Sequence, residues 1–398
     1  MRTKRFDILK SAAFAGGVGL SGILAGAAPG ANAATAATPP SAFDFDAVLT
    51  TDTLSDVQGG LKQGTRTIAN LDLTSAWKGQ DGWESFVYVE VTHGGGFSEQ
   101  YSGDTQFVSN IDLPAGIHLS EGWVRKTSRG GHFVSTLGFN NVNNMFDVQD
   151  VGALFLNTSH GIAIEFGQSG ASGKPICAFG FTQEWRPRAD IHVRGGLFDA
   201  VAGDPEHGSV FATAYYSSRT GLQYQVEMQK DFAGGFVKLG HWGNTAPSDP
   251  LDGVGAPGRY SGTYGQLSAT LSQEADGPEQ GLKGWVRVGN ADARLLAFDR
   301  YVGGGLVYTG PFRGRDHDQA GIALASGHYG KSYRATVTEP VTTESSYEAS
   351  YQYEVKPGLV LQPDLQYVEH PSGLSSVKDA VVVTLRVRVG IDALRSPG

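Results

Sequence analysis

Acidic, aromatic and basic side chains share one face of a short stretch in the first third of the chain. Every second residue of that stretch belongs to this set: Glu121, Trp123 and Arg125. In an extended strand, residues two positions apart point to the same side. The carboxylate and guanidinium groups hydrogen-bond to hydroxyls, and the indole ring packs against C–H surfaces. The set predicts hydrogen bonding and apolar contact rather than nucleophilic chemistry.

Further basic side chains occupy the polar faces of later extended segments. They are Arg194, Lys283, Arg287, Arg386 and Arg388. Cross-strand ion pairs that brace a sheet are the alternative role for each of them. Between two such segments, the polar stretch from Asn157 to Gly170 either folds inward as a constriction or lies on the surface as a loop.

Catalytic and metal-binding interpretations find weaker support. Glu121 and Glu184 fit the paired carboxylates of a glycosidase, but the sequence gives no separation for them and charged pairs are common in channel linings. The run Asp316–Asp318 could ligate a metal ion, but it has no second ligand cluster nearby and predicts a solvated extracellular loop. The single cysteine, Cys177, excludes a disulfide framework and a cysteine-based zinc site. We therefore expect no enzyme activity, no metal and no cofactor.

Composition and the N-terminal segment narrow the class of protein. Of 398 residues, 56 are glycine, roughly double the usual share of ~7%. The formal net charge of -9 argues against a nucleic-acid partner. Residues 1–33 combine a basic start, an apolar stretch and an Ala-Asn-Ala end, and thus predict a secretory signal peptide, followed by a flexible segment over 34–42. No later run of ~18 apolar residues exists, which excludes a helical membrane protein.

Alternation of apolar and polar residues recurs along the remaining chain, most cleanly near its end, and predicts many strands. The clearest examples are Ser346–Val355, Leu359–Tyr367 and Val381–Gly390. Alternation fits either a soluble sandwich or a transmembrane barrel, which point their apolar faces in opposite directions. Aromatic residues near the turns and polar faces with both charge signs favour the barrel. About 365 residues would supply 16 strands of about 23 residues each with their connections.

Several motifs, in order along the chain, resemble the carbohydrate-selective porin (OprB) family. They are Phe146–Gly161, Glu165–Gly170, Phe198–Pro205, Phe298–Tyr308 followed by Pro311–Arg315, Leu361–Val368 and Lys378–Val383. The resemblance implies an all-β, 16-stranded antiparallel barrel over residues 43–391, with a tail over 392–398.

The resemblance also implies a function and partners. These are facilitated diffusion of glucose and related monosaccharides through the bacterial outer membrane, contact with outer-membrane lipid and with the barrel assembly machinery, and the homotrimer that porins often form. In such a channel, polar-face residues near mid-strand would line the pore and contact the sugar: Glu121, Trp123, Arg125, Arg194, Lys283, Arg287, Arg386 and Arg388. A general small-solute porin and a secreted β-sandwich that binds or cleaves polysaccharide are the alternatives.

Overall fold

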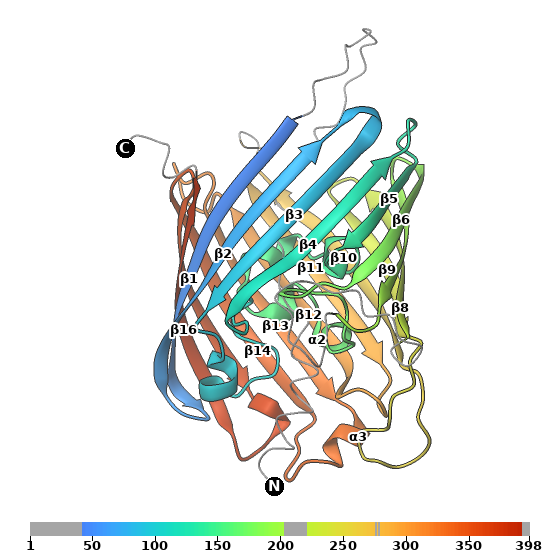
Figure 1. Ribbon diagram of the computed structural model, residues 1–398. Helices are drawn as coiled ribbons and strands as arrows, with labels where there is room; N and C mark the ends of the chain where they lie inside the picture. The colour runs from blue at the N-terminus through green and yellow to red at the C-terminus, as the bar shows by residue number, and fades with distance from the viewer. Residues whose placement is uncertain (1–41, 203–220, 275–276, 278, 392–398) are drawn as a thin grey trace.

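The computed structural model describes residues 42–202, 221–274, 277 and 279–391. Within them, sixteen antiparallel strands pair in sequence order, and β1 pairs with β16 to close a barrel (Figure 1). The predicted 16-stranded barrel is thereby confirmed and the soluble sandwich is excluded. The predicted signal peptide, residues 34–41 of the flexible segment and the C-terminal tail lie outside the described residues.

The strands have the following bounds: β1 (Ala42–Gly60), β2 (Gly64–Lys78), β3 (Trp83–His93), β4 (Gly116–Thr127), β5 (Phe133–Phe139), β6 (Phe179–Arg188), β7 (Ile191–Asp199), β8 (Leu222–Phe232), β9 (Gly235–Asn244), β10 (Ser261–Gln273), β11 (Gly281–Ala291), β12 (Phe298–Thr309), β13 (Gln319–Tyr329), β14 (Thr343–Lys356), β15 (Leu359–Glu369) and β16 (Lys378–Gly390).

The alternating sequence sets which side chains face outward. On β16, Val383 and Leu385 are 45% and 48% exposed, whereas Thr384 and Arg386 between and beside them are 1% and 8% exposed. The apolar side chains therefore lie on the outer wall and the polar ones inside the barrel. This is the arrangement of a barrel surrounded by lipid.

The connections at the two ends of the barrel differ in length. At one end the strands are joined by short turns, such as 189–190, 233–234 and 357–358. At the other end they are joined by segments that include residues 94–115 and 140–178, here called the first and the second inward loop. Figure 1 shows α2 (Ile164–Gly167), part of the second inward loop, inside the ring of strands, and α3 (Lys331–Arg334) near the end with the long connections. Among the described residues, no helix is long and apolar enough to cross a membrane.

Many glycines of the wall lie beneath an aromatic ring on a neighbouring position. Tyr264 lies next to Gly240 on the adjacent strand, and a Cβ atom at Gly240 would come within 2.2 Å of the tyrosine ring. The ring has little freedom to move, because its hydroxyl donates to Glu227 (2.7 Å) and accepts from the backbone N–H of Asp147 (3.0 Å). The high glycine content thus makes room for large side chains that point into the barrel.

A substitution at Gly240 tests this packing. We expect Gly240→Ala to lower the free energy of unfolding by about 1–3 kcal/mol, the usual cost of overpacking. The measurement is the temperature at which the folded barrel band disappears in semi-native electrophoresis. Gly265→Ala is the matched control, because a Cβ atom there would meet nothing closer than 3.8 Å. Equal transition temperatures for the two variants would contradict the packing argument.

Candidate functional site

The second inward loop fills part of the barrel interior. Every residue from Leu154 to Ser169 is buried, although the segment belongs to no strand. Its partners lie on β8, β10, β11, β12, β14 and β15, strands from widely separated parts of the barrel wall. Of the two alternatives for Asn157 to Gly170, the structure shows the inward-folded segment.

Arg287 on β11 holds this loop through two carboxylates. Its Nε and Nη2 atoms donate to the two carboxylate oxygens of Asp147 at 3.0 and 2.9 Å, and its Nη1 atom donates to Glu165. The rings of Tyr264 and Tyr301 lie 4.9 and 5.3 Å from the guanidinium carbon. Arg287 is only 1% exposed, so its charge is removed from water and compensated entirely by the loop and these rings.

Strands β14 and β15 hold the middle of the same loop. Glu348 accepts hydrogen bonds from the backbone N–H groups of Leu156 (2.5 Å) and Asn157 (3.1 Å). Gln362 donates to the carbonyl of Leu154 at 2.6 Å. Burial lowers the pKa of the neighbouring His160 to about 3, so its imidazole is neutral at pH 7 and packs against Phe155. The loop is therefore fixed at several points around the wall.

The first inward loop is held in a similar way. Arg386 on β16 donates to Asp52 on the next strand at 2.7 Å and to the loop residue Asn110 at 2.7 Å. Inside the loop, Asp112 accepts backbone N–H groups, including that of Ser98 at 2.8 Å. Burial raises the pKa of Asp112. Glu344 on β14 accepts the backbone N–H group of Gln106 at 3.0 Å.

The eight predicted pore-lining residues divide into two groups. All eight lie on the inward-facing side of their strands, as the pairing register and the burial pattern show. Buried against the inward loops are Glu121, Arg287 and Arg386. Partly or fully exposed on the inner face are Trp123, Arg125, Arg194, Lys283 and Arg388. That they contact a passing solute stays a prediction.

Trp123 and Arg125 form one exposed part of the inner wall. The ring of Phe86, directly opposite on β3, stacks on Trp123 with centroids 5.3 Å apart, and the Arg125 guanidinium carbon lies 4.4 Å from the indole. Glu121 accepts from the indole Nε1 at 3.2 Å and from Asn144 of the second inward loop at 2.8 Å. The aromatic and cationic surface therefore borders directly on the loop.

A second group of charges lies on β6, β7 and β8. Glu184 accepts from Arg186 (2.5 Å), Arg194 (3.1 Å) and His192, and Arg194 also donates to Glu227 at 2.6 Å. The side chain of Arg186 is 41% exposed, but those of Glu184 and Glu227 are 6% and 0% exposed. The cation is thus the group that faces water here, while the carboxylates lie behind it. Glu184 and Glu121 are both engaged as acceptors in these networks.

Neither the cysteine nor the acidic turn offers reactive chemistry. Cys177 is buried, and burial raises the pKa of its thiol well above its ordinary value. Asp318 is bound by Arg315 and by the Tyr351 hydroxyl at 2.5 Å. Within the part of the chain that the structure describes, no group of three or more His, Cys, Asp or Glu residues is placed to hold a metal ion.

Sequence reasoning located the inner-face cations but missed the anchoring role of Glu348, Glu227 and Gln362. Each of these lies on a strand face that the alternation marks as polar. Their partners are 80 to 208 residues away in the chain, so no local signal identifies them as anchors of a loop.

Removing the cation of Arg287 tests whether it fixes the second inward loop. Arg287→Met leaves two buried carboxylates uncompensated, and breaking a buried ion pair costs roughly 3–5 kcal/mol. We expect the loop to detach, with larger and noisier single-channel conductance in planar bilayers and cleavage by protease in the region of residues 140–178. Arg129→Met is the matched control, since Arg129 is exposed in the turn between β4 and β5 and forms no ion pair with a described residue. Identical conductance for wild type and Arg287→Met would exclude the anchoring role.

Comparison with known proteins agrees with this geometry. A family model described as "Carbohydrate-selective porin, OprB family" matches residues 62–390. Porin B of Pseudomonas aeruginosa is 21% identical over 249 residues, and the putative porin QuiX of Acinetobacter baylyi is 30% identical over 103 residues. These matches cover 54% and 21% of this chain, and 55% and 24% of the two relatives, so the chain matches about half of the first relative's length.

A solved structure of similar fold is the high-pH structure of Pseudomonas putida OprB. It is 18% identical, with a TM-score of 0.77 over 88% of this chain and 94% of that one. Fold and family together indicate a channel of the bacterial outer membrane rather than an enzyme. With a family model matching most of its length and a closed 16-stranded barrel, the chain belongs to the carbohydrate-selective porin (OprB) family.

Proposed function

We propose that this chain mediates facilitated diffusion of small carbohydrates, of the size of glucose, across the bacterial outer membrane. The observation that carries the proposal is the inner-wall surface of Trp123 and Arg125, which lies beside the second inward loop and has both an aromatic and a cationic component. The family match supports a carbohydrate as the solute class.

The chemistry of this surface suits a neutral polyhydroxylated ring. A guanidinium group donates several hydrogen bonds to hydroxyl oxygens, and an aromatic ring provides apolar contact for the C–H face of a sugar. Arg194 and Lys283, on other strands of the same inner face, add further donors. Transport requires that such contacts replace part of the hydration shell and still release the solute on the far side.

The lengths of the connections give an orientation. Barrels of this class have short turns on the periplasmic side and longer loops outside the cell. The end with the turns 189–190, 233–234 and 357–358 is then periplasmic, and both inward loops enter the lumen from the extracellular end. A solute entering from outside would pass the inward loops on its way to the periplasm.

Liposome swelling with the purified protein distinguishes a sugar channel from a general porin. Glucose, a disaccharide and an amino acid of similar size to glucose are compared at equal osmolarity. A sugar-selective lumen gives fast swelling with glucose and slower swelling with the amino acid. Swelling rates that follow solute size alone would instead indicate a general small-solute porin. The homotrimer stays a prediction, which native electrophoresis of the same preparation would test.

Replacing the aromatic ring tests the proposed contact surface. We expect Trp123→Leu to lower the rate of swelling in glucose by roughly three- to tenfold, while small-ion conductance changes little. That loss corresponds to about 0.7–1.4 kcal/mol, at 1.4 kcal/mol per factor of ten. Trp185→Leu is the matched control, because Trp185 is 46% exposed on the outer wall. A glucose rate that is unchanged in Trp123→Leu would remove this surface from the solute path.

A further inference from the structure

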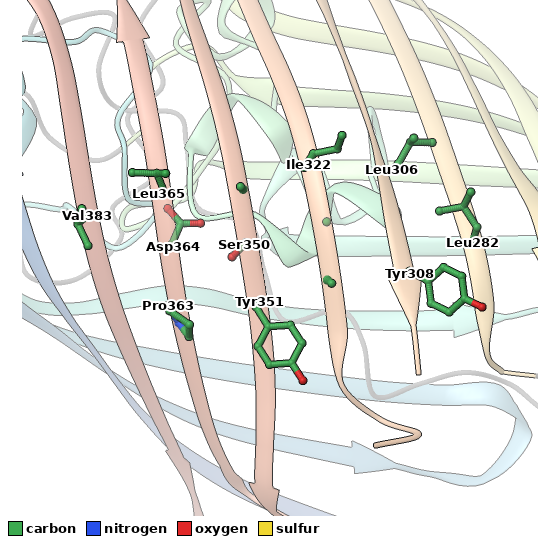
Figure 2. Close-up of a pocket in the computed structure, with 13 residues that line it drawn as sticks. Leu282, Leu306, Tyr308, Ile322, Ser350, Tyr351, Pro363, Asp364, Leu365 and Val383 are labelled. Carbon is green, nitrogen blue, oxygen red and sulfur yellow. The ribbon is translucent and has the colours of Figure 1, made fainter. Parts of the chain in front are cut away.

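A hollow of about 680 Å³ opens on the outer wall of the barrel, across strands β11 to β16. The hollow is shallow and open to the surroundings over most of its surface. Its lining is almost entirely apolar. Figure 2 shows Leu306 on β12, Ile322 on β13 and Leu365 on β15, with Tyr308 and Tyr351 nearer to the strand ends. Because outward-facing residues form its rim, the hollow faces the lipid and not the lumen.

Two small residues among large ones create this hollow. In one row across the sheet, Ala320 lies between Tyr308 and Tyr351. In the next row, Ala349 lies between Ile322 and Leu365. The methyl groups of the two alanines form the floor, and the larger neighbours rise on both sides. The depression is therefore fixed by side chains of a rigid wall.

Pro363 adds a break in the strand pairing at the same place. The pairing of β14 with β15 runs as far as Ser350 with Asp364 and resumes only at Tyr353 with Leu361. Proline has no backbone N–H group and cannot donate to a neighbouring strand. Opposite Tyr351, the wall therefore lacks a backbone hydrogen bond, and the proline ring lies in the lining of the hollow.

One end of the hollow carries the features of a headgroup region. The ring of Phe312, in the turn between β12 and β13, lies 6.0 Å from that of Tyr351 and is 61% exposed. Arg313 follows it and is exposed, as is Asp316 later in the turn, whereas the guanidinium of Arg315 stacks on Tyr353 at 3.9 Å. Aromatic residues followed by a cation mark the level of lipid headgroups, where phosphate attracts arginine.

We propose that this hollow binds one acyl chain of a membrane glycerophospholipid, whose phosphate lies beside Arg313. A thin, flexible hydrocarbon chain fills a concave surface between side chains. A second barrel would present the convex face of a sheet and would bridge the hollow without filling it. The turn 310–318 lies at the end that the proposed orientation makes periplasmic, where the outer membrane consists of phospholipid. The lipid site is separate from the solute path, since its rim lies on the opposite face of the wall.

Native mass spectrometry of the detergent-extracted, delipidated barrel tests the proposal. The protein is incubated with palmitoyl-oleoyl phosphatidylglycerol, and the fraction that retains one lipid is measured as the detergent is removed in the gas phase. We expect wild type to retain one phospholipid and the double variant Ala320→Leu, Ala349→Leu to retain at least fivefold less. Arg313→Gln should weaken retention by a smaller factor, because it leaves the acyl site intact.

Ala269→Leu is the matched control, since Ala269 also faces outward, on β10, between two glycines of neighbouring strands. It should retain lipid as wild type does. Equal retention by the double variant and the control would overturn the proposal. A second outcome would also overturn it: wild type binds no lipid but forms oligomers, and the double variant forms none. The hollow would then be a contact site for a second copy of the chain. The swelling rates of all these variants should match wild type, so failure here leaves the proposed sugar transport untouched.

Discussion

The shape of the lumen depends on a buried contact between one arginine of the wall and two carboxylates of a loop. A closed barrel of sixteen strands encloses a space that its own side chains cannot fill, and the second inward loop occupies part of it. Arg287 binds Asp147 and Glu165 at the two ends of the loop's central portion. A buried ion pair of this kind is weak evidence for high stability. Removing one of its partners is nevertheless strongly destabilising, because the other charge is then buried without compensation. The position of the loop inside the barrel follows from that constraint.

Arginines on the inner face therefore serve two purposes that their sequence context does not distinguish. Arg287 and Arg386 are covered by the inward loops and bind carboxylates or an amide. Their guanidinium groups therefore hold the loops in place. Arg125 and Arg194 keep part of their surface in water beside the same loops. The inner-face cations that stay partly exposed are thus those that the loops do not cover. Arg125 and the indole of Trp123 thus lie beside the second inward loop.

The sequence predicts the wall well and the interior poorly, for a physical reason. A period of two residues determines the face to which each side chain points, and it correctly placed Thr384 and Arg386 inside and Val383 and Leu385 outside. The same period carries no information on what covers an inward-facing side chain. Arg287 and Lys283 are four residues apart on one face of β11, yet one is buried under a loop and the other is exposed. That difference depends on the fold of a loop more than 100 residues earlier in the chain, whose inward course the sequence left open.

The interrupted pairing of β14 and β15 affects both the inner and the outer face of the wall. Pro363 removes a backbone hydrogen bond there, and inside the barrel a side-chain bond joins the same two strands, from Gln362 Nε2 to Ser350 Oγ at 2.8 Å. The same amide also donates to the carbonyl of Leu154 in the second inward loop at 2.6 Å. The residue that compensates for the break thus also holds the loop, so the wall at this point depends on the loop being in place. On the outer face no side chain offers such compensation, because the surroundings are apolar. A hollow remains there, which is the arrangement expected where the filling material is lipid rather than protein.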